Sequence, residues 1–272
     1  MKKRLSTIAL IVVFLVGLSV LLYPTVSDYL NSVRQSKMIV DYEKAISELS
    51  EKDYSKYWNA AVAYNQKLAG LNNPMANYAN ISGYRDTLNI TRNGIIGYIS
   101  IDKIRCEIPI YHGTSPEVLN VAAGHLEGTS LPVGGIGTHA VISAHRGLPS
   151  AKLFTNLDKL QNGDTFTVTV LNQVLTYEVD QVLIVLPEET QELQLQEGKD
   201  VVTLLTCTPY GINTHRLLVR GHRIETQDTH RNVFITSDAY LIEPLTVAPV
   251  VAAPILLVLL IVLMIKYRKK KK

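Results

Sequence analysis

This sequence contains few cysteines and tryptophans, and it lacks the residue spacings typical of metal sites. Its 272 residues include two cysteines, Cys106 and Cys207, and one tryptophan. Neither Cys-X-X-Cys nor His-Glu-X-X-His occurs, and no phosphate loop or dinucleotide-binding glycine pattern is present. We therefore expect no metal and no cofactor. Two cysteines allow at most one disulfide, which excludes a disulfide-rich framework.

Charge is missing from two long stretches, residues 5–27 and 244–265. Each is about long enough to cross a bilayer as a helix, whose backbone satisfies its own hydrogen bonds. Basic residues flank the outer ends, at 2–4 and in the tail at 266–272. By the positive-inside rule we expect a cell-membrane protein with both termini cytoplasmic and the middle outside. A cleaved signal peptide is the alternative for the first stretch, although Thr25-Val26-Ser27 is a poor cleavage site.

The net charge of +3 hides a separation of charge along the chain. Nine of the 27 basic residues lie in the two ends, which leaves 18 against 24 acidic residues between them. The middle of the chain is therefore acidic, and a nucleic-acid-binding body is not supported.

Helical spacing dominates residues 28–70. Apolar side chains fall on one face from Ile39 to Leu49, and a second helix is expected after the charged residues 51–53. Residues 71–93 are rich in turn formers and predict a linker, so 28–93 is expected to be an extracellular helical region. It either packs against the main domain or forms a stalk or cover.

From residue 94 the pattern changes to short apolar strands separated by turns. Strands are expected at 97–101, 107–111, 140–144, 165–171, 174–185, 201–205 and 217–223, with short helices at 116–126 and 150–160. This mainly β pattern predicts a closed or nearly closed barrel over 94–226. Residues 227–243 are polar and predict a tether to the second apolar stretch.

Three side chains suited to acyl transfer lie at strand ends. Cys207 lies just after the strand 201–205, His145 follows the strand 140–144, and Arg216 immediately precedes the strand 217–223. A cysteine attacks as thiolate, a histidine can hold and return the proton, and an arginine is a fixed cation for a developing oxyanion. These residues therefore predict a catalytic site.

Each of the three has rivals. Cys207 can instead be a buried core residue, and Arg220 and Arg223 compete with Arg216. Six other histidines are present: His112, His125, His139, His215, His222 and His230. Cys106 lies in a turn-like stretch where no strand end presents it, so it is interpreted as structural or incidental. A disulfide with Cys207 is the disfavoured alternative, because it would remove the nucleophile.

The motifs around these residues resemble those of the class C, pilus-assembling sortases of Gram-positive bacteria. Thr-Leu-Leu-Thr-Cys at 203–207 is similar to the sortase signature, and 208–221 is similar to its class C continuation. Residues 124–132 and 138–149 resemble the class C stretch around the catalytic histidine. The likeness covers residues 97–223, and two membrane spans are also typical of that class.

The resemblance implies an eight-stranded sortase barrel and a cysteine transpeptidase. Cys207 would attack a Leu-Pro-X-Thr-Gly-like sorting signal between Thr and Gly, with His145 as acid and base and Arg216 as oxyanion partner. A lysine amine of another pilin would resolve the thioester, so the implied partners are pilin or surface-protein substrates and the membrane.

One segment departs from the class C pattern. Enzymes of that class commonly carry an Asp-Pro-aromatic lid motif, whereas this chain has Asn73-Pro74-Met75. No lid residue is therefore carried over. The alternatives are a housekeeping sortase that anchors proteins to peptidoglycan, a hydrolytic cysteine peptidase, and an exported scaffold protein with an inert Cys207.

Overall fold

The computed structural model describes residues 2–226 together with positions 257 and 261. The described residues fall into two units, residues 2–30 with positions 257 and 261, and residues 31–226. Apart from positions 257 and 261, the expected second span, the tether and the basic tail lie outside the described residues.

Helix α1 (Lys2–Ser47) carries the N-terminal apolar stretch. From Ile11 onward it is long and apolar enough to cross a membrane, with a mean hydropathy of 1.9 and no burial in its most apolar window. Length and apolar composition make α1 a candidate membrane span. Signal sequences share both properties.

Helix α2 (Glu51–Ala69) begins where a break in the helical region was expected. The Ser50 hydroxyl caps it by accepting a hydrogen bond from the Asp53 amide at 3.2 Å. Glu51 and Asp53 lie in the first turn, where carboxylates favour the positive end of the helix dipole. The charged residues 51–53 therefore form the first turn of α2 instead of a break between α1 and α2.

Buried polar contacts fasten both helices to the strands. The Tyr42 hydroxyl of α1 donates to the Ile96 carbonyl at 3.2 Å and accepts from the Leu171 amide at 2.8 Å. In α2, Asn65 exchanges two hydrogen bonds with the Leu131 backbone, at 2.9 and 2.7 Å. Unpaired groups at such depth would be costly, so these contacts fix where the helices pack. The helical region thus packs against the main domain, as the first of the two expectations stated.

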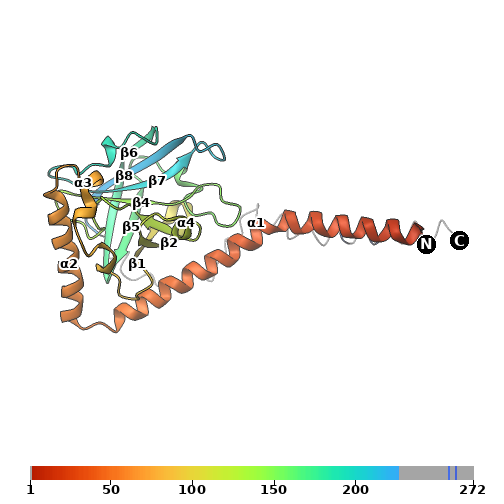
Figure 1. The fold of residues 1–272 in the computed structure, drawn as a ribbon, viewed down its shortest axis with the longest axis horizontal. Coiled ribbons are helices and arrows are strands. Elements are labelled where there is room, and N and C mark those ends of the chain that lie inside the picture. The colour runs from red at the N-terminus through yellow and green to blue at the C-terminus, as the bar shows by residue number, and fades with distance from the viewer. Residues whose placement is uncertain (1, 227–256, 258–260, 262–272) are drawn as a thin grey trace. The chain divides into compact units, whose positions relative to one another are not determined.

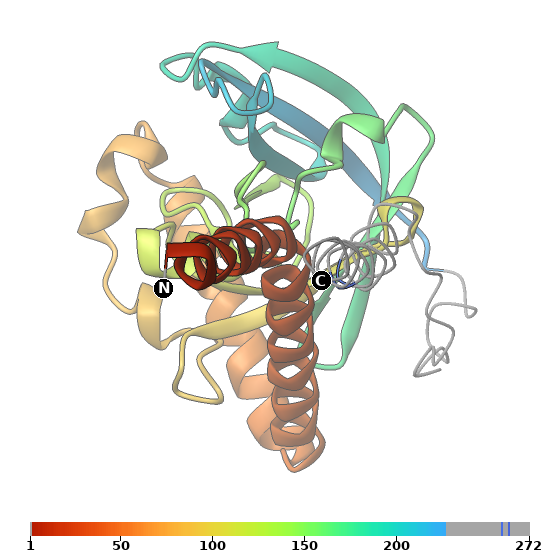
Figure 2. The same ribbon diagram turned by 90° about the vertical axis from the view of Figure 1, so that its right-hand side faces the viewer.

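Eight strands close into a barrel in the order β1-β2-β3-β4-β7-β8-β6-β5 (Figure 1). The strands are β1 (Ile95–Ile101), β2 (Cys106–His112), β3 (Ala123–His125), β4 (Thr138–Ser143), β5 (Thr165–Val170), β6 (Gln173–Val185), β7 (Asp200–Thr208) and β8 (His215–Ile224). The pairs β2–β3 and β4–β7 are parallel, and the other pairs are antiparallel. Figure 2 shows the long strands β6, β7 and β8, coloured teal to blue, beside one another. The expected mainly β, eight-stranded barrel is confirmed.

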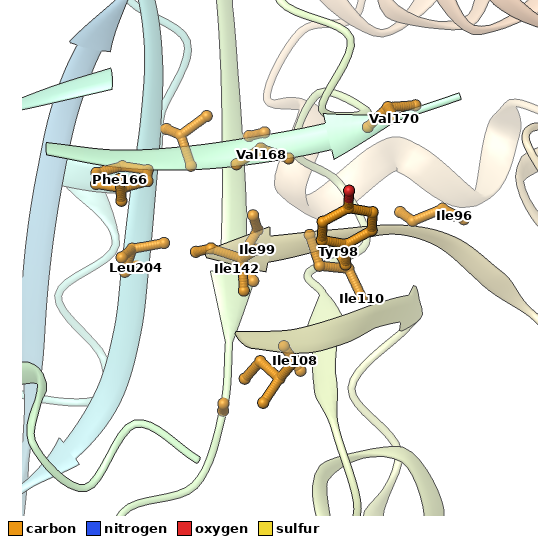
Figure 3. Close-up of a cluster of buried hydrophobic side chains, with 14 of the residues drawn as sticks. Ile96, Tyr98, Ile99, Ile108, Ile110, Ile142, Phe166, Val168, Val170 and Leu204 are labelled. Carbon is orange, nitrogen blue, oxygen red and sulfur yellow. The ribbon is translucent and has the colours of Figure 1, made fainter. Parts of the chain in front are cut away.

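Branched aliphatic side chains fill the barrel interior. Ile99 of β1, Ile142 of β4 and Leu204 of β7 are fully buried and gather near Phe166 and Val168 of β5 (Figure 3). Full burial of such a side chain stabilises the fold by about 1.5–3 kcal/mol. This interior forms the rigid base on which the outer face of β7 and β8 carries the candidate site.

Strand β3 was not predicted from the sequence. Residues 116–126 were expected to be a helix, but helix α4 (Pro116–Leu119) is a single turn and β3 follows it. A Cβ on Gly124 would lie 2.2 Å from the Gly113 carbonyl oxygen, so this strand needs glycine at a close backbone approach. Glycine weakens the strand pattern, which explains the wrong prediction.

The helix expected at 150–160 is also wrong. This segment contains turns, an isolated β-bridge at Ala151 and one 3₁₀ turn, η4 (Leu157–Lys159). Phe154, Leu157 and Leu160 are nevertheless buried in the core. Their helix-like spacing therefore reflects a loop that packs inward.

Candidate active site

The pairing of β7 with β8 places Arg216 directly opposite Cys207. Directly opposed residues of an antiparallel pair project on the same face, with Cβ atoms about 4.5–5.5 Å apart. Both side chains are only half-buried. The Arg216 guanidinium therefore lies on the same face as the Cys207 thiol, near the end of β7.

The pairing of β4 with β7 brings His145 to the other side of Cys207. The last parallel partners are Ser143 and Leu205. Beyond them the Ala144 amide donates to the Leu205 carbonyl at 3.1 Å, and the Thr206 hydroxyl donates to the Ala144 carbonyl at 2.8 Å. The next residue of that segment is His145, so β7 lies between the chain segments that carry the histidine and the arginine.

Three of the rival histidines are committed to buried structural contacts. The rings of His112, His125 and His139 each bridge two neighbouring groups, and burial lowers the pKa of all three, that of His125 to about 4. His145 is instead half-buried at a strand end. His215 is the cross-strand partner of Thr208, so it projects on the opposite face from Cys207. His230 lies outside the described residues.

The two cysteines have different surroundings. Both are free thiols, but Cys106 is buried and Cys207 is partly exposed. Burial raises the pKa of Cys106 to about 12, with a smaller contribution from Glu107. A thiol with such a pKa does not supply thiolate at neutral pH, so Cys207 is the better placed nucleophile.

A groove of about 300 Å³ runs along the same outer face. Its floor includes Leu205 and Arg216 of the two central strands, and its lining includes Met75. Leu205 and Cys207 are two residues apart on one strand and so share a face. Cys207 is not itself among the lining residues of the described groove but lies next to it along the strand.

The Arg216 side chain is held close to its own loop. Its Nη1 donates to the carbonyls of Asn213 at 3.2 Å and His215 at 3.1 Å. The guanidinium carries further N–H donors at Nε and Nη2, which suit a substrate oxygen. A planar fork of donors beside the thiol is the arrangement that oxyanion stabilisation needs.

The structure thus brings together the three residues expected from the sequence, Cys207, His145 and Arg216. Sequence reasoning missed Met75 and the β6–β7 loop, residues 186–199, as parts of the groove. Met75 belongs to the short helix α3 (Pro74–Asn77), which lies against Gly128. The only sequence signal for this position was its place in the segment that departs from the lid motif.

A closed eight-stranded barrel that carries a cysteine, a histidine and an arginine near one end of β7 has the side chains that a cysteine acyl-transfer enzyme needs. The model of the Sortase domain matches residues 99–224. Two crystal structures resemble the chain at high identity. Sortase C1 from Streptococcus agalactiae is 47% identical with a TM-score of 0.65, and the match covers 70% of this chain and all of that one. Sortase C from Streptococcus pneumoniae is 45% identical with a TM-score of 0.64, covering 70% of this chain and 97% of that one.

The chain belongs to the sortase family of cysteine transpeptidases. It is also 29% identical over 131 residues to sortase D of Bacillus subtilis, a match that covers 47% of this chain and 63% of that protein. The match therefore spans less than two thirds of that relative's length. Family membership favours an enzyme over the exported scaffold considered from the sequence.

Proposed function

We propose that this protein cleaves a Leu-Pro-X-Thr-Gly-like sorting signal between Thr and Gly and joins the acyl group to a lysine amine of a pilin. The observation that carries the proposal is the register of β7, which sets Cys207 between the His145 segment and Arg216. The adjacent groove can hold an extended apolar peptide. The crystal structure of the S. pneumoniae sortase C bears on pilin substrate specificity, which favours the same substrate class for this chain.

The proposed reaction uses the three residues in two half-reactions. His145 takes the proton of Cys207, and the sulfur attacks the Thr carbonyl carbon. Arg216 donates hydrogen bonds to the oxyanion of the tetrahedral intermediate. His145 then protonates the leaving Gly amine, which breaks the C–N bond and leaves a thioester.

The second half-reaction restores the thiol. A neutral lysine amine attacks the thioester carbonyl, and His145 accepts the proton that the amine loses. The C–S bond breaks, the new isopeptide bond remains, and the proton returns to Cys207. No oxidant or cofactor is needed for this balance.

We place the catalytic barrel outside the cell, with α1 as the membrane anchor and both termini cytoplasmic. The apolar stretch of α1 and its basic start support the N-terminal part of this arrangement. The basic residues after 244–265 support the C-terminal part.

The test is covalent capture of the acyl-enzyme. The full chain in detergent micelles is incubated with a Leu-Pro-Glu-Thr-Gly peptide and weighed intact by mass spectrometry. Wild type and Cys106→Ala should gain the acyl fragment as a hydroxylamine-labile adduct, whereas Cys207→Ala should gain nothing. An adduct on Cys207→Ala would refute the assignment of the nucleophile.

The acceptor separates this proposal from a housekeeping sortase. With Nα-acetyl-lysine amide and triglycine offered together, a pilus-type enzyme should form the ε-amine product in excess. Exclusive use of triglycine would favour the peptidoglycan-anchoring alternative.

A further inference from the structure

One wall of the groove is the β6–β7 loop. The loop residues that line the groove are Leu186, Pro187, Glu189, Thr190 and Leu193. Apart from the 3₁₀ turn η5 (Gln191–Leu193) and isolated turns, the loop has no regular structure, and most of its residues are exposed. Leu193 is buried and packs in a small cluster with Val141 and Leu218. The position of this wall therefore depends on few attachments.

His139 of β4 supplies a buried polar attachment. Its ring is fully buried, with Nδ1 2.8 Å from the Gln194 carbonyl and Nε2 2.7 Å from the Thr203 hydroxyl. A carbonyl only accepts, so Nδ1 carries the proton and Nε2 accepts from Thr203. The neutral imidazole thus joins the floor strand β7 to the loop.

The other polar side-chain contacts of the described loop to the barrel are longer. Arg220 Nη1 donates to Gln196 Oε1 at 3.4 Å, and Gln181 Nε2 donates to Glu192 Oε2 at 3.3 Å. All three contacts to the loop are partly buried, but only the contact to Gln194 comes from a fully buried side chain, and it is the shortest. Burial also lowers the pKa of His139, which keeps the ring neutral as the bridge requires.

We infer that His139 is a positioning residue for substrate binding, because it holds the β6–β7 loop in place as the wall of the groove. The inference rests on the proposed function for its substrate, a sorting-signal peptide. His139 lies six residues before His145, yet its ring bonds to the loop and to Thr203. It acts on peptide affinity and leaves the reactivity of Cys207 unchanged.

The experiment compares three variants of the full chain in detergent micelles. His139→Leu removes both hydrogen bonds. His139→Asn keeps an N–H donor where Nδ1 lies, and Thr203→Val removes only the hydroxyl. Turnover of a fluorogenic Leu-Pro-Glu-Thr-Gly peptide gives KM and kcat, iodoacetamide labelling reports Cys207, and hydrogen exchange reports the amides of residues 186–197.

His139→Leu should raise KM about tenfold, with kcat and the labelling rate within about twofold of wild type, because it removes binding that is equal in ground and transition states. His139→Asn should restore most of the KM. An unchanged KM in folded His139→Leu overturns the inference, as does a loss of kcat and labelling without a change in KM.

A second variant and a second measurement test the inference if the first variant or the peptide assay fails. If His139→Leu does not fold, Thr203→Val decides: a KM raised about threefold supports the inference, and an unchanged KM overturns it. If wild type cleaves no peptide, the proposed function fails, and loop exchange then judges the His139 contact by itself. Faster exchange of the loop amides in the variant supports the contact, and unchanged exchange overturns it.

Discussion

The buried ring of His125 should make the fold sensitive to acid. This side chain is fully buried, with Nε2 2.7 Å from the Ser130 carbonyl and Nδ1 2.8 Å from the Tyr84 hydroxyl. The carbonyl requires the proton on Nε2, so Nδ1 accepts from Tyr84. A second proton would have to enter a fully buried site in which Tyr84 already donates to the ring.

Burial lowers the pKa of His125 from 6.5 to about 4 in the folded protein. Between these values the unfolded chain binds a proton that the folded chain does not, so stability falls as the pH falls. Above pH 6.5 His125 contributes no pH dependence, and below about pH 4 its contribution levels off. The difference of about 2.5 units corresponds to about 3 kcal/mol at 1.36 kcal/mol per unit.

Urea unfolding at a series of pH values from 7 to 4 measures this loss, with Trp58 fluorescence as the probe, since this tryptophan packs against the core. The free energy of unfolding should decrease by about 3 kcal/mol from His125, and further from His112 and His139, whose pKa values are also lowered. His125→Gln keeps a donor near the Nε2 position but does not titrate, so its pH dependence should be shallower. An equally steep dependence in that variant would refute the assignment to His125.

Three further substitutions test the site and its support. Arg216→Lys should lower kcat about 100-fold in peptide turnover, because lysine lacks the planar fork of donors, and near-normal turnover would mean that Arg216 is structural. Arg146→Met removes the bond from Nη1 to Thr208 Oγ1 at 3.2 Å, which ties the residue after His145 to the residue after Cys207. We expect kcat to fall about tenfold while iodoacetamide still labels the thiol, and an unchanged kcat would contradict this. Gly124→Ala should lower the thermal midpoint by several degrees, since its Cβ would lie 2.2 Å from the Gly113 carbonyl oxygen, and an unaltered midpoint would show that β3 can shift.

Local patterns located the strand ends that carry Cys207 and His145, but they did not show how those strands pair. The apolar run before Cys207 and the strand before His145 each mark a strand end, and strand ends present side chains to ligands. The pairing of Cys207 with Arg216 was beyond local reasoning, because the six residues between β7 and β8 do not specify a two-residue turn with a fixed register. A slip of one residue would have turned Arg216 to the other face.

The groove depends on contacts that no local pattern contains. Met75 reaches it because α3 lies against Gly128, whose φ of +87° suits glycine and whose added Cβ would come 2.8 Å from the Met75 Cα. The wall formed by the β6–β7 loop is attached in part by an imidazole hydrogen bond from His139 to Gln194, 55 residues away along the chain. The proposed reacting groups thus lie on strands β7 and β8 and on the segment just beyond β4, whereas loops shape much of the groove proposed to hold the peptide. Substitutions in these attachments should therefore change which peptides bind before they change how fast Cys207 reacts.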